Sequence, residues 1–274
     1  MGVITLTTDF GLQDPYVAAA KGVILSINPQ VTIVDISHSV EPQNIRQAAF
    51  LLSTTHHYFP KGTIHVAVVD PGVGTERRAV LLVTPRGFFI APDNGLLSYI
   101  VDETPVHELQ AYAITNTGYF LSPVSDTFHA RDVFAPVAAH LSRGMSPQEF
   151  GEGIASIIAF PIPRPHVGED GVLVGHILHI DRFGNLITDI KRSNLPRGRV
   201  FIEIHGHIVD DLSHTYADED EQGLLALVGS SGNLEVSMSN SSAARFLQAK
   251  MGDEVKVGKN EASLRQVITR ETET

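Results

Sequence analysis

The sequence predicts an α/β chain in two parts: an N-terminal α/β domain with a mainly parallel sheet, and a smaller C-terminal, mostly antiparallel and barrel-like β domain. Strand-like apolar runs alternate with helical patterns over roughly the first 160 residues. This alternation is typical of parallel strands joined by right-handed crossovers. After a proline-rich stretch come short strand-like runs separated by turn residues, a pattern typical of small antiparallel barrels.

The first part begins with a buried strand followed by a helix, and this pair is repeated once before a third strand. The expected strands are Val3–Thr7, Val31–Ile36 and Ile64–Val69. The expected helices are Tyr16–Ile27 and Asn44–Tyr58, where apolar residues recur at helical spacing. Asp14 is expected to cap the first helix and Pro15 to be its first residue, because Asp and Pro favour those positions.

Two aspartates follow expected parallel strands. Asp9 lies in the turn after Val3–Thr7, and Asp70 begins a glycine-containing turn after Ile64–Val69. Ligands of open α/β sheets bind beyond the carboxyl ends of the strands. We therefore expect Asp9 and Asp70 to face one pocket.

The boundary between the two parts is expected in PIPRPHVGEDG, where three prolines prevent a helix or a central strand. This gives an α/β domain over residues 1–160, a linker over 161–170 and a barrel-like domain over 171–274. The second domain's strands are expected at Gly171–Ile180, Leu186–Ile190, Arg199–Ile208, Leu224–Val228 and Leu234–Met238. A short helix is expected at about Ser242–Gln248, and the acidic run Asp218–Glu221 is expected to be a solvated loop.

Composition excludes several classes of function. A formal net charge of −11 opposes binding to nucleic acid or to an anionic membrane, because both need an excess of Lys and Arg. The absence of cysteine excludes disulfides, thiolate zinc sites and a cysteine nucleophile. No apolar run reaches about 18 residues and the first residues carry no export signal, so a cytoplasmic protein is expected. The turn PGVGTERR also lacks the patterns that bind nucleoside triphosphates or NAD.

Six blocks stand out along the chain: TTDFG, DISHSVEP, VVDPGVGTERR, APDNGLLS, FHARDVFAP and DRFGNLITDI. In order and spacing they resemble the S-adenosylmethionine hydroxide adenosyltransferase family, whose relatives include the fluorinase and chlorinase enzymes. The resemblance covers roughly residues 3–258. It implies cleavage of S-adenosylmethionine by water to adenosine and methionine, without metal or cofactor. It also implies a homotrimer with active sites between neighbouring subunits.

The resemblance implies that Asp70, Arg77 and His129 form the catalytic triad. A sulfonium is already a good leaving group, but water is a weak nucleophile with a pKa of ~15.7. Arg77 can hold a developing hydroxide with fixed donors, and His129 can orient the same water. Asp70 can accept a hydrogen bond from Arg77 or from His129, and it can help to take up the proton of the water. The sequence leaves open which group finally takes the proton, and Arg78 beside Arg77 leaves a second candidate for the arginine.

Other matching positions are expected to bind the substrate. Asp9 is expected to accept hydrogen bonds from the ribose hydroxyls, since it matches the family's ribose-binding aspartate. Asn94 is expected near the sugar or the triad, with a turn role as the alternative. The remaining substrate-binding candidates are Phe128, Asp181, Phe183, Asn185, Ser242 and Ala244. Of these, the residues from 181 to 185 resemble the segment that receives the methionine ammonium and flanks the adenine.

Two rival functions stand beside hydrolysis. A halide-using adenosyltransferase is disfavoured, because Asp70 would repel a halide and Ala130 occupies the position of the fluorinase's hydroxyl residue. A module that senses S-adenosylmethionine or adenosine with negligible turnover is disfavoured by the complete triad. We expect no metal at the histidine groups His56 with His57, His176 with His179, or His205 with His207.

Overall fold

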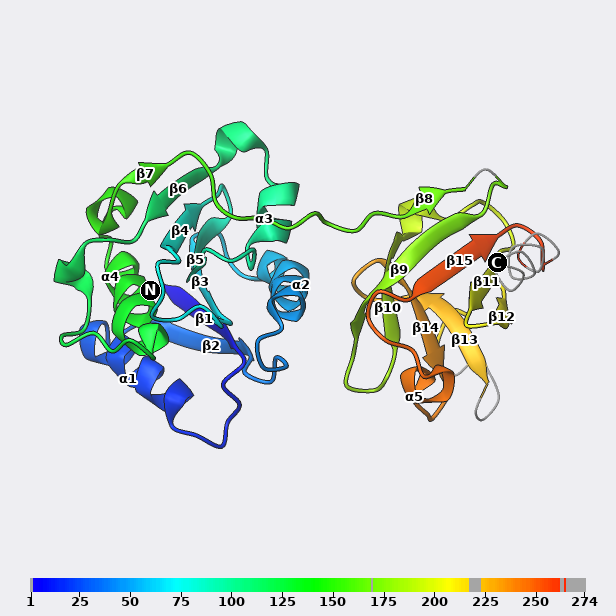
Figure 1. Ribbon diagram of the computed structural model, residues 1–274, viewed down its shortest axis with the longest axis horizontal. Coiled ribbons are helices and arrows are strands. Elements are labelled where there is room, and N and C mark those ends of the chain that lie inside the picture. The colour runs from blue at the N-terminus through cyan, green and yellow to red at the C-terminus, as the bar shows by residue number, and fades with distance from the viewer. Residues whose placement is uncertain (1, 169, 217–222, 262–263, 265–274) are drawn as a thin grey trace. The chain divides into compact units, whose positions relative to one another are not determined.

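The computed structural model describes residues 2–168, 170–216, 223–261 and 264. The chain divides into two compact units, Met1–Ile162 and Pro163–Thr274. Each unit contains its own sheet, as Figure 1 shows. No helix in the described ranges has the length and apolar character needed to cross a membrane.

The first unit is built on a seven-stranded mixed sheet in the order β2-β1-β3-β5-β4-β6-β7. The parallel part contains β1 (Val3–Thr8), β2 (Thr32–Ser37), β3 (Thr63–Val68) and β5 (Gly87–Pro92). The antiparallel part contains β4 (Ala79–Val83), β6 (Gln110–Ala113) and β7 (Gly153–Ile154). The sequence thus predicted the parallel strands β1, β2 and β3, and missed the fourth parallel strand, β5, and the antiparallel strands.

Helices cover both faces of this sheet and make three layers (Figure 1). On one side lie α1 (Tyr16–Ile27) and α4 (Ala135–Ser142), and on the other lie α2 (Ile45–Thr55) and α3 (Ser98–Glu103). The alternation along β3 explains the arrangement, because Ile64, Val66 and Val68 belong to one core. Ala67, on the opposite face, belongs to the other core.

Short helical turns complete the first unit. They are η1 (His56–Tyr58), η2 (Val106–Glu108), η3 (Thr117–Tyr119), the π-helical η4 (Ala130–Phe134) and η5 (Pro147–Phe150).

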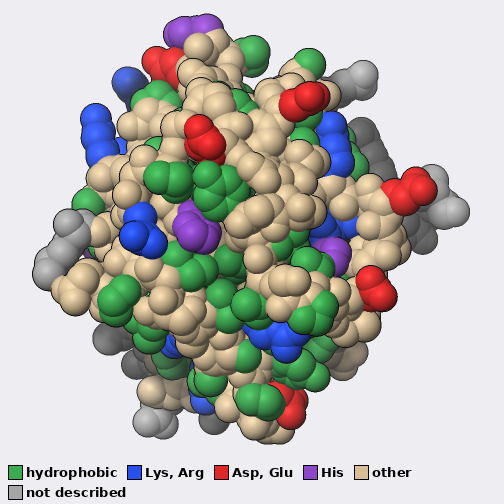
Figure 2. Space-filling model, turned by 90° about the vertical axis from the view of Figure 1, so that its left-hand side faces the viewer, with side chains coloured by type: hydrophobic (Ala, Val, Ile, Leu, Met, Phe, Trp, Pro, Cys, Tyr) green, Lys and Arg blue, Asp and Glu red, His purple; other side chains and the backbone are tan. Residues whose placement is uncertain are grey.

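On the face drawn in Figure 2, charged side chains are spread among hydrophobic and polar ones. The described part of this face therefore carries no contiguous basic patch.

The second unit is a β domain of largely antiparallel pairs. Its strands follow the order β12-β11-β15-β9-β10-β14-β13, with β8 paired to β9. Their bounds are β8 His166–Val167, β9 Leu173–Ile180, β10 Leu186–Lys191, β11 Phe201–Ile204, β12 His207–Asp210, β13 Leu224–Val228, β14 Asn233–Met238 and β15 Glu254–Gly258. The helical elements are η6 (Arg192–Asn194) and α5 (Ala243–Leu247). The antiparallel, barrel-like character expected from the sequence is confirmed.

Several element boundaries differ from those predicted. Pro15 occupies the N-cap of α1 and no side chain caps that helix, so the predicted cap at Asp14 is wrong. The helix predicted to reach Tyr58 ends at Thr55 and continues as the tighter turn η1. The single run predicted at Arg199–Ile208 is a hairpin, because His205 turns the chain at φ 49°. The acidic run Asp218–Glu221, predicted to be a solvated loop, lies outside the described residues.

Candidate active site

Asp70 and Arg77 form a bidentate ion pair at the carboxyl end of β3. Arg77 Nε donates to Asp70 Oδ1 at 2.9 Å, and Arg77 Nη2 donates to Asp70 Oδ2. Only 11% of the Arg77 side chain and 6% of the Asp70 side chain are exposed. A paired, charge-assisted geometry of this kind fixes the orientation of both groups.

Gly74 lets the turn that carries this pair approach a distant loop. Its φ is 77°, and a Cβ built there would lie 2.3 Å from the carbonyl oxygen of Asp126. No side chain fits such a position, so glycine is required. The close approach brings the loop that contains His129 to the Asp70–Arg77 pair.

His129 completes the cluster through Arg77. Nη2 of Arg77 lies 2.9 Å from Nδ1 of His129. A guanidinium only donates hydrogen bonds, so Nδ1 accepts and the neutral ring carries its proton on Nε2. Burial, followed by the charge of Arg77, lowers the pKa of His129 below its usual value against the opposing effect of nearby carboxylates. The imidazole is therefore neutral at pH 7.

A buried carboxylate anchors the loop of His129. The π-helical turn Ala130–Phe134 follows His129 directly, and such turns are frequent at functional sites. Within it, the fully buried Asp132 accepts from Ser125 N at 2.8 Å and from Arg131 Nε at 2.6 Å. Asp132 thus ties the start of this loop, at Ser125, to the helical turn that follows His129.

Asp9 and Asp70 line one pocket, as the sequence predicted. The pocket has a volume of about 300 Å³ and is also lined by Phe128 and His129. The Oδ2 atom of Asp9 accepts a hydrogen bond from Gln43 N at 2.9 Å. Within the described residues, the Gln43 N–H is the one donor that orients this carboxylate, and Asp9 lines the pocket beside it.

Aromatic rings form one wall of this region. Phe10, Tyr16 and Phe128 contact one another edge to face, with ring centroids 5.1 to 6.0 Å apart. Gln43 and the ring of Phe10 were not among the sequence-predicted site residues, although both line the pocket. Gln43 lies at φ 66° beside the DISHSVEP block, and its role depends on its backbone N–H rather than on its side chain.

Asn94 and Arg78 lie near the cluster without entering the pocket. Asn94 Nδ2 donates to the carbonyl oxygen of Val69 at 2.9 Å, and its Oδ1 accepts from Leu96 N at 3.2 Å. Its amide therefore holds the residue before Asp70 and a turn of its own. Arg78 is directed to Asp93, with Nε 2.8 Å from Oδ2. The structure thus brings Arg77, and not Arg78, to His129.

The second unit gathers the other five predicted substrate-binding residues at a second hollow. This hollow has a volume of about 1120 Å³, and its lining includes Asp181, Phe183, Asn185, Ser242 and Ala244. The Phe183 ring is 77% exposed at its rim. An exposed aromatic beside a hollow can stack on a flat, apolar ligand group.

Hydrogen bonds within the turn hold the walls of this hollow. Asp181 Oδ1 accepts from the backbone N–H groups of Phe183 and Asn185, each at 2.9 Å. Asp181 Oδ2 accepts from Asn185 Nδ2, also at 2.9 Å. Ala244 N donates to the carbonyl oxygen of Gly184 at 2.9 Å, so the turn is joined to the start of α5.

Tyr216 is a residue of this hollow that sequence reasoning missed, as is its hydrogen-bond partner Glu235 behind it. Tyr216 lines the hollow, and its hydroxyl donates to Glu235 Oε2 at 2.8 Å. Burial and the bond to Glu235 raise the pKa of Tyr216 to about 12. Burial also raises the pKa of Glu235. Neither residue lies in a recognisable motif, so only the folded chain brings them together.

Two of the histidine groups considered for a metal are separated by the fold. His205 lies in the turn between β11 and β12, where Nδ1 is 2.9 Å from Leu247 O and Nε2 is 2.9 Å from Asp253 Oδ2. It therefore does not share a strand face with His207. His176 and His179 lie three residues apart on β9 and point to opposite faces of that strand.

A three-layer α/β unit with a carboxylate, a guanidinium and an imidazole at its strand ends defines an enzyme-type domain that binds a small molecule. Residues 4–151 match the model of the SAM hydroxide adenosyltransferase N-terminal domain, and residues 175–256 match that of the SAM hydroxide adenosyltransferase C-terminal domain. The chain belongs to the SAM hydroxide adenosyltransferase family.

Individual relatives agree with this membership. An (R)-S-adenosyl-L-methionine hydrolase from Salinispora arenicola (strain CNS-205) is 37% identical, over 93% of this chain and 97% of the relative. A fluorinase from Actinoplanes sp. (strain N902-109) is 33% identical, over 72% of this chain and 74% of the relative. An uncharacterized conserved protein from Thermotoga maritima has a crystal structure similar to this one, with a TM-score of 0.86 and 34% identity, over 93% of this chain and all of that one.

Proposed function

We propose that this chain hydrolyses S-adenosylmethionine to adenosine and methionine. Family membership and the similarity to (R)-S-adenosyl-L-methionine hydrolases support this function. The observation that carries it is the Asp70–Arg77–His129 cluster at the 300 Å³ pocket of the first unit. These are fixed polar groups of the kind that can hold and orient a water molecule.

In the proposed reaction, the oxygen of water attacks the ribose C5′ opposite the sulfur. The new C5′–O bond forms as the C5′–S bond breaks, and the bonding electrons leave with the neutral thioether of methionine. The water also loses a proton. Because Nδ1 of His129 is engaged by Arg77, His129 directs its Nε2–H toward the attacking oxygen and orients it. Asp70, which keeps lone pairs beyond its two bonds to Arg77, is the proposed proton acceptor.

Substrate binding is assigned to residues of both units. Asp9 is the proposed acceptor for the ribose hydroxyls, since it lines the same pocket as Asp70. The hollow lined by Asp181, Phe183 and Asn185 is the proposed site for the adenine and methionine groups. We also propose that the protein is a homotrimer with active sites formed between subunits, as the family resemblance implies. Light scattering of the purified protein tests the number of subunits.

The test of the function is a chromatographic assay in H₂¹⁸O with S-adenosylmethionine. Adenosine and methionine are expected in equal amounts, with the label on the 5′ oxygen of adenosine, and without change on adding a chelator. Asp70→Ala is expected to abolish turnover while calorimetry still detects S-adenosylmethionine binding. Unchanged turnover in Asp70→Ala would exclude the assigned triad.

The same assay separates the rival functions. Parallel reactions with fluoride or chloride would yield a halogenated deoxyadenosine if the chain were a halide-using enzyme like its fluorinase relatives. Binding without turnover would instead favour a sensing module. The carboxylate of Asp70 in the pocket favours water over a halide ion, because an anion is repelled there.

A further inference from the structure

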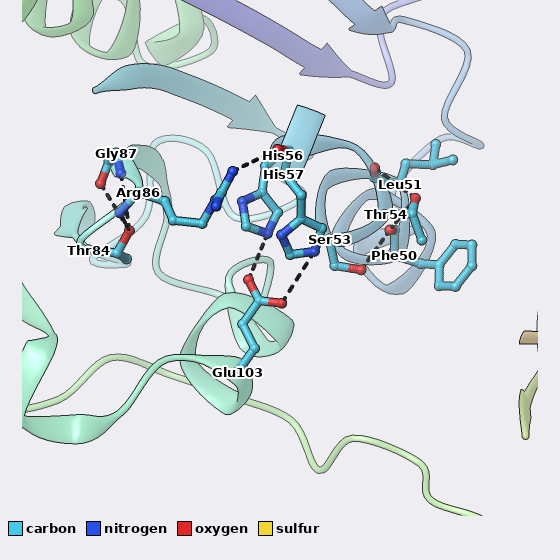
Figure 3. A network of polar contacts seen from close by, with 10 residues as sticks. All are labelled: Phe50, Leu51, Ser53, Thr54, His56, His57, Thr84, Arg86, Gly87 and Glu103. Carbon is cyan, nitrogen blue, oxygen red and sulfur yellow. Dashed lines mark hydrogen bonds and ion pairs between the residues drawn. The ribbon is translucent and has the colours of Figure 1, made fainter. Parts of the chain in front are cut away.

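A second group of titratable side chains lies away from the active-site pocket. His56 and His57 form the tight turn that follows α2, and Glu103 is the last residue of α3. Figure 3 shows both imidazoles directed toward the Glu103 carboxylate. His56 Nε2 is 2.6 Å from Glu103 Oε1, and His57 Nε2 is 3.7 Å from Glu103 Oε2.

The contact between His56 and Glu103 is not an ordinary hydrogen bond. Within the described residues, neither ring nitrogen of His56 makes an aligned hydrogen bond, although only 2% of the side chain is exposed. A buried imidazole without such a partner is unfavourable. The Nε2 atom thus lies close to a carboxylate oxygen without an aligned N–H···O bond, an arrangement that a cation bound by both atoms would satisfy.

The spacing of the three groups suits a metal ion at that point. One ligand atom from each residue can be chosen so that all three lie within 4.8 Å of one another. Two ligands of a tetrahedral zinc ion, each about 2.0–2.2 Å from the metal, lie about 3.4 Å apart. Small side-chain rotations that lengthen the His56 contact and shorten the His57 contact would therefore give this geometry.

The surroundings leave room and charge for such an ion. The cluster opens onto a cavity of about 230 Å³, which shares no lining residue with the active-site pocket. Glu103 and Glu108 contribute two carboxylates to this lining, against the single guanidinium of Arg86. The Arg86 guanidinium is engaged by the backbone of the same turn, since Nη2 donates to the carbonyl oxygen of His57 at 2.7 Å. The cavity can supply water to the remaining coordination position.

We propose that His56, His57 and Glu103 bind one divalent transition-metal ion of the zinc class. Two imidazoles and one carboxylate form a ligand set that binds zinc in preference to the hard cations magnesium and calcium. The ion joins the end of α2 to the end of α3 and therefore stabilises the face of the sheet that these helices cover. This site is separate from the proposed hydrolytic site.

The binding test uses untagged, full-length protein freed of metal by a chelator, titrated with zinc chloride in a calorimeter. Wild-type protein is expected to bind one zinc ion per chain. His57→Ala and Glu103→Gln are each expected to weaken this binding by at least about tenfold. His57 is suited to truncation because 48% of its side chain is exposed. His107→Ala is the matched control, since this neighbouring histidine is 82% exposed and lies outside the cluster.

A second measurement reports the ligands directly. Cobalt(II) bound to metal-free protein is expected to give visible absorption of a low-coordinate site, and Glu103→Gln is expected to change that spectrum. Zinc is also expected to raise the thermal unfolding temperature of the wild type by several degrees, and not that of His57→Ala. The proposal is overturned if wild-type protein binds no zinc, or if both ligand variants bind it as tightly as the wild type and His107→Ala.

Discussion

The Nη2 atom of Arg77 lies 2.9 Å from Nδ1 of His129. The same guanidinium is held by Asp70 through Nε and Nη2. Arg77 therefore has two effects on the imidazole: it selects the tautomer with a proton on Nε2, and it opposes protonation at Nδ1. Asp70 fixes Arg77, and Arg77 in turn fixes His129, so the three groups act as one unit.

Replacing Arg77 tests this unit. Arg77→Lys keeps the positive charge, but an ammonium cannot pair with Asp70 through two nitrogens and also contact His129. We expect kcat for S-adenosylmethionine hydrolysis to fall by about 10²–10³, because Arg77 positions both Asp70 and His129 at the reacting centre. KM should stay within a few-fold, because Arg77 is not among the residues that line either hollow. Steady-state kinetics provide the measurement.

Arg78→Lys is the matched control for this substitution. Arg78 is adjacent in sequence but bonds to Asp93 and to the carbonyl oxygen of Ser156. The Arg78→Lys variant should keep kcat within a few-fold of the wild-type value. Equal losses of kcat in the two variants would show that the choice of Arg77 over Arg78 is wrong.

The lowered pKa of His129 gives a pH dependence. The imidazole stays neutral until the pH falls below the ordinary histidine value of 6.5, because burial and the charge of Arg77 both oppose its protonation. We expect kcat/KM to be constant from neutral pH down to that value and to decrease only below it. In an NMR titration, Arg77→Gln should raise the pKa of His129, since the neighbouring Asp70 then acts without the guanidinium. A decrease of kcat/KM that begins above pH 6.5 in the wild type would contradict this assignment.

The parallel strands β1, β2 and β3 could be predicted because each is a short apolar run next to a helical pattern. The strands β4, β5, β6 and β7 could not be predicted in the same way. Leu81 and Leu82 on β4 are both buried, on opposite faces, so that strand has no polar alternation. The hairpin β11–β12 was predicted as one run although Gly206 at φ 81° lies in its turn, because the first turn residue, at φ 49°, is a histidine and does not itself signal a turn.

The candidate site was predictable where a short motif carries the residue. Asp70, Arg77 and His129 each lie in a block that resembles the family, and the structure brings them into contact. Gln43 was missed because its backbone N–H, and not its side chain, holds Asp9. Glu103 was missed as a partner of His56 because α3 and the end of α2 meet only in the folded chain. Contacts between distant segments of this kind leave no local pattern.

His65 is expected to make stability depend on pH. Burial, followed by the charges of His56 and Arg86, lowers the pKa of His65 to about 3. In the unfolded chain His65 binds a proton near pH 6.5, whereas in the folded chain it binds a proton only near pH 3. The free energy of unfolding should therefore fall as the pH is lowered between these values, by up to about 1.4 kcal/mol per unit from this group.

Chemical denaturation at several pH values measures this contribution. In His65→Gln, the decrease of the unfolding free energy with falling pH should be less steep than in the wild type. The exposed His107 provides the control, and His107→Gln should keep the wild-type slope. Parallel curves for the wild type and His65→Gln would contradict the assignment.

Gly184 is expected to be essential to the hollow of the second unit. Its φ is 88°, and a Cβ built there would lie 2.0 Å from Ser242 Oγ, the atom that caps α5. Gly184→Ala must therefore displace the turn from α5, at a cost of about 2–4 kcal/mol of unfolding free energy from overpacking and the positive φ. KM for S-adenosylmethionine should rise at least tenfold, because both displaced segments line the hollow.

Gly198→Ala separates the clash from the backbone strain. Gly198 has nearly the same φ, 89°, but no atom lies within 4 Å of the added Cβ. This variant should lose only about 1 kcal/mol of unfolding free energy and keep its KM. Denaturation and steady-state kinetics of the two variants give the comparison. If Gly184→Ala kept the wild-type KM while losing stability, the hollow between the Gly184 turn and α5 would not be where S-adenosylmethionine binds.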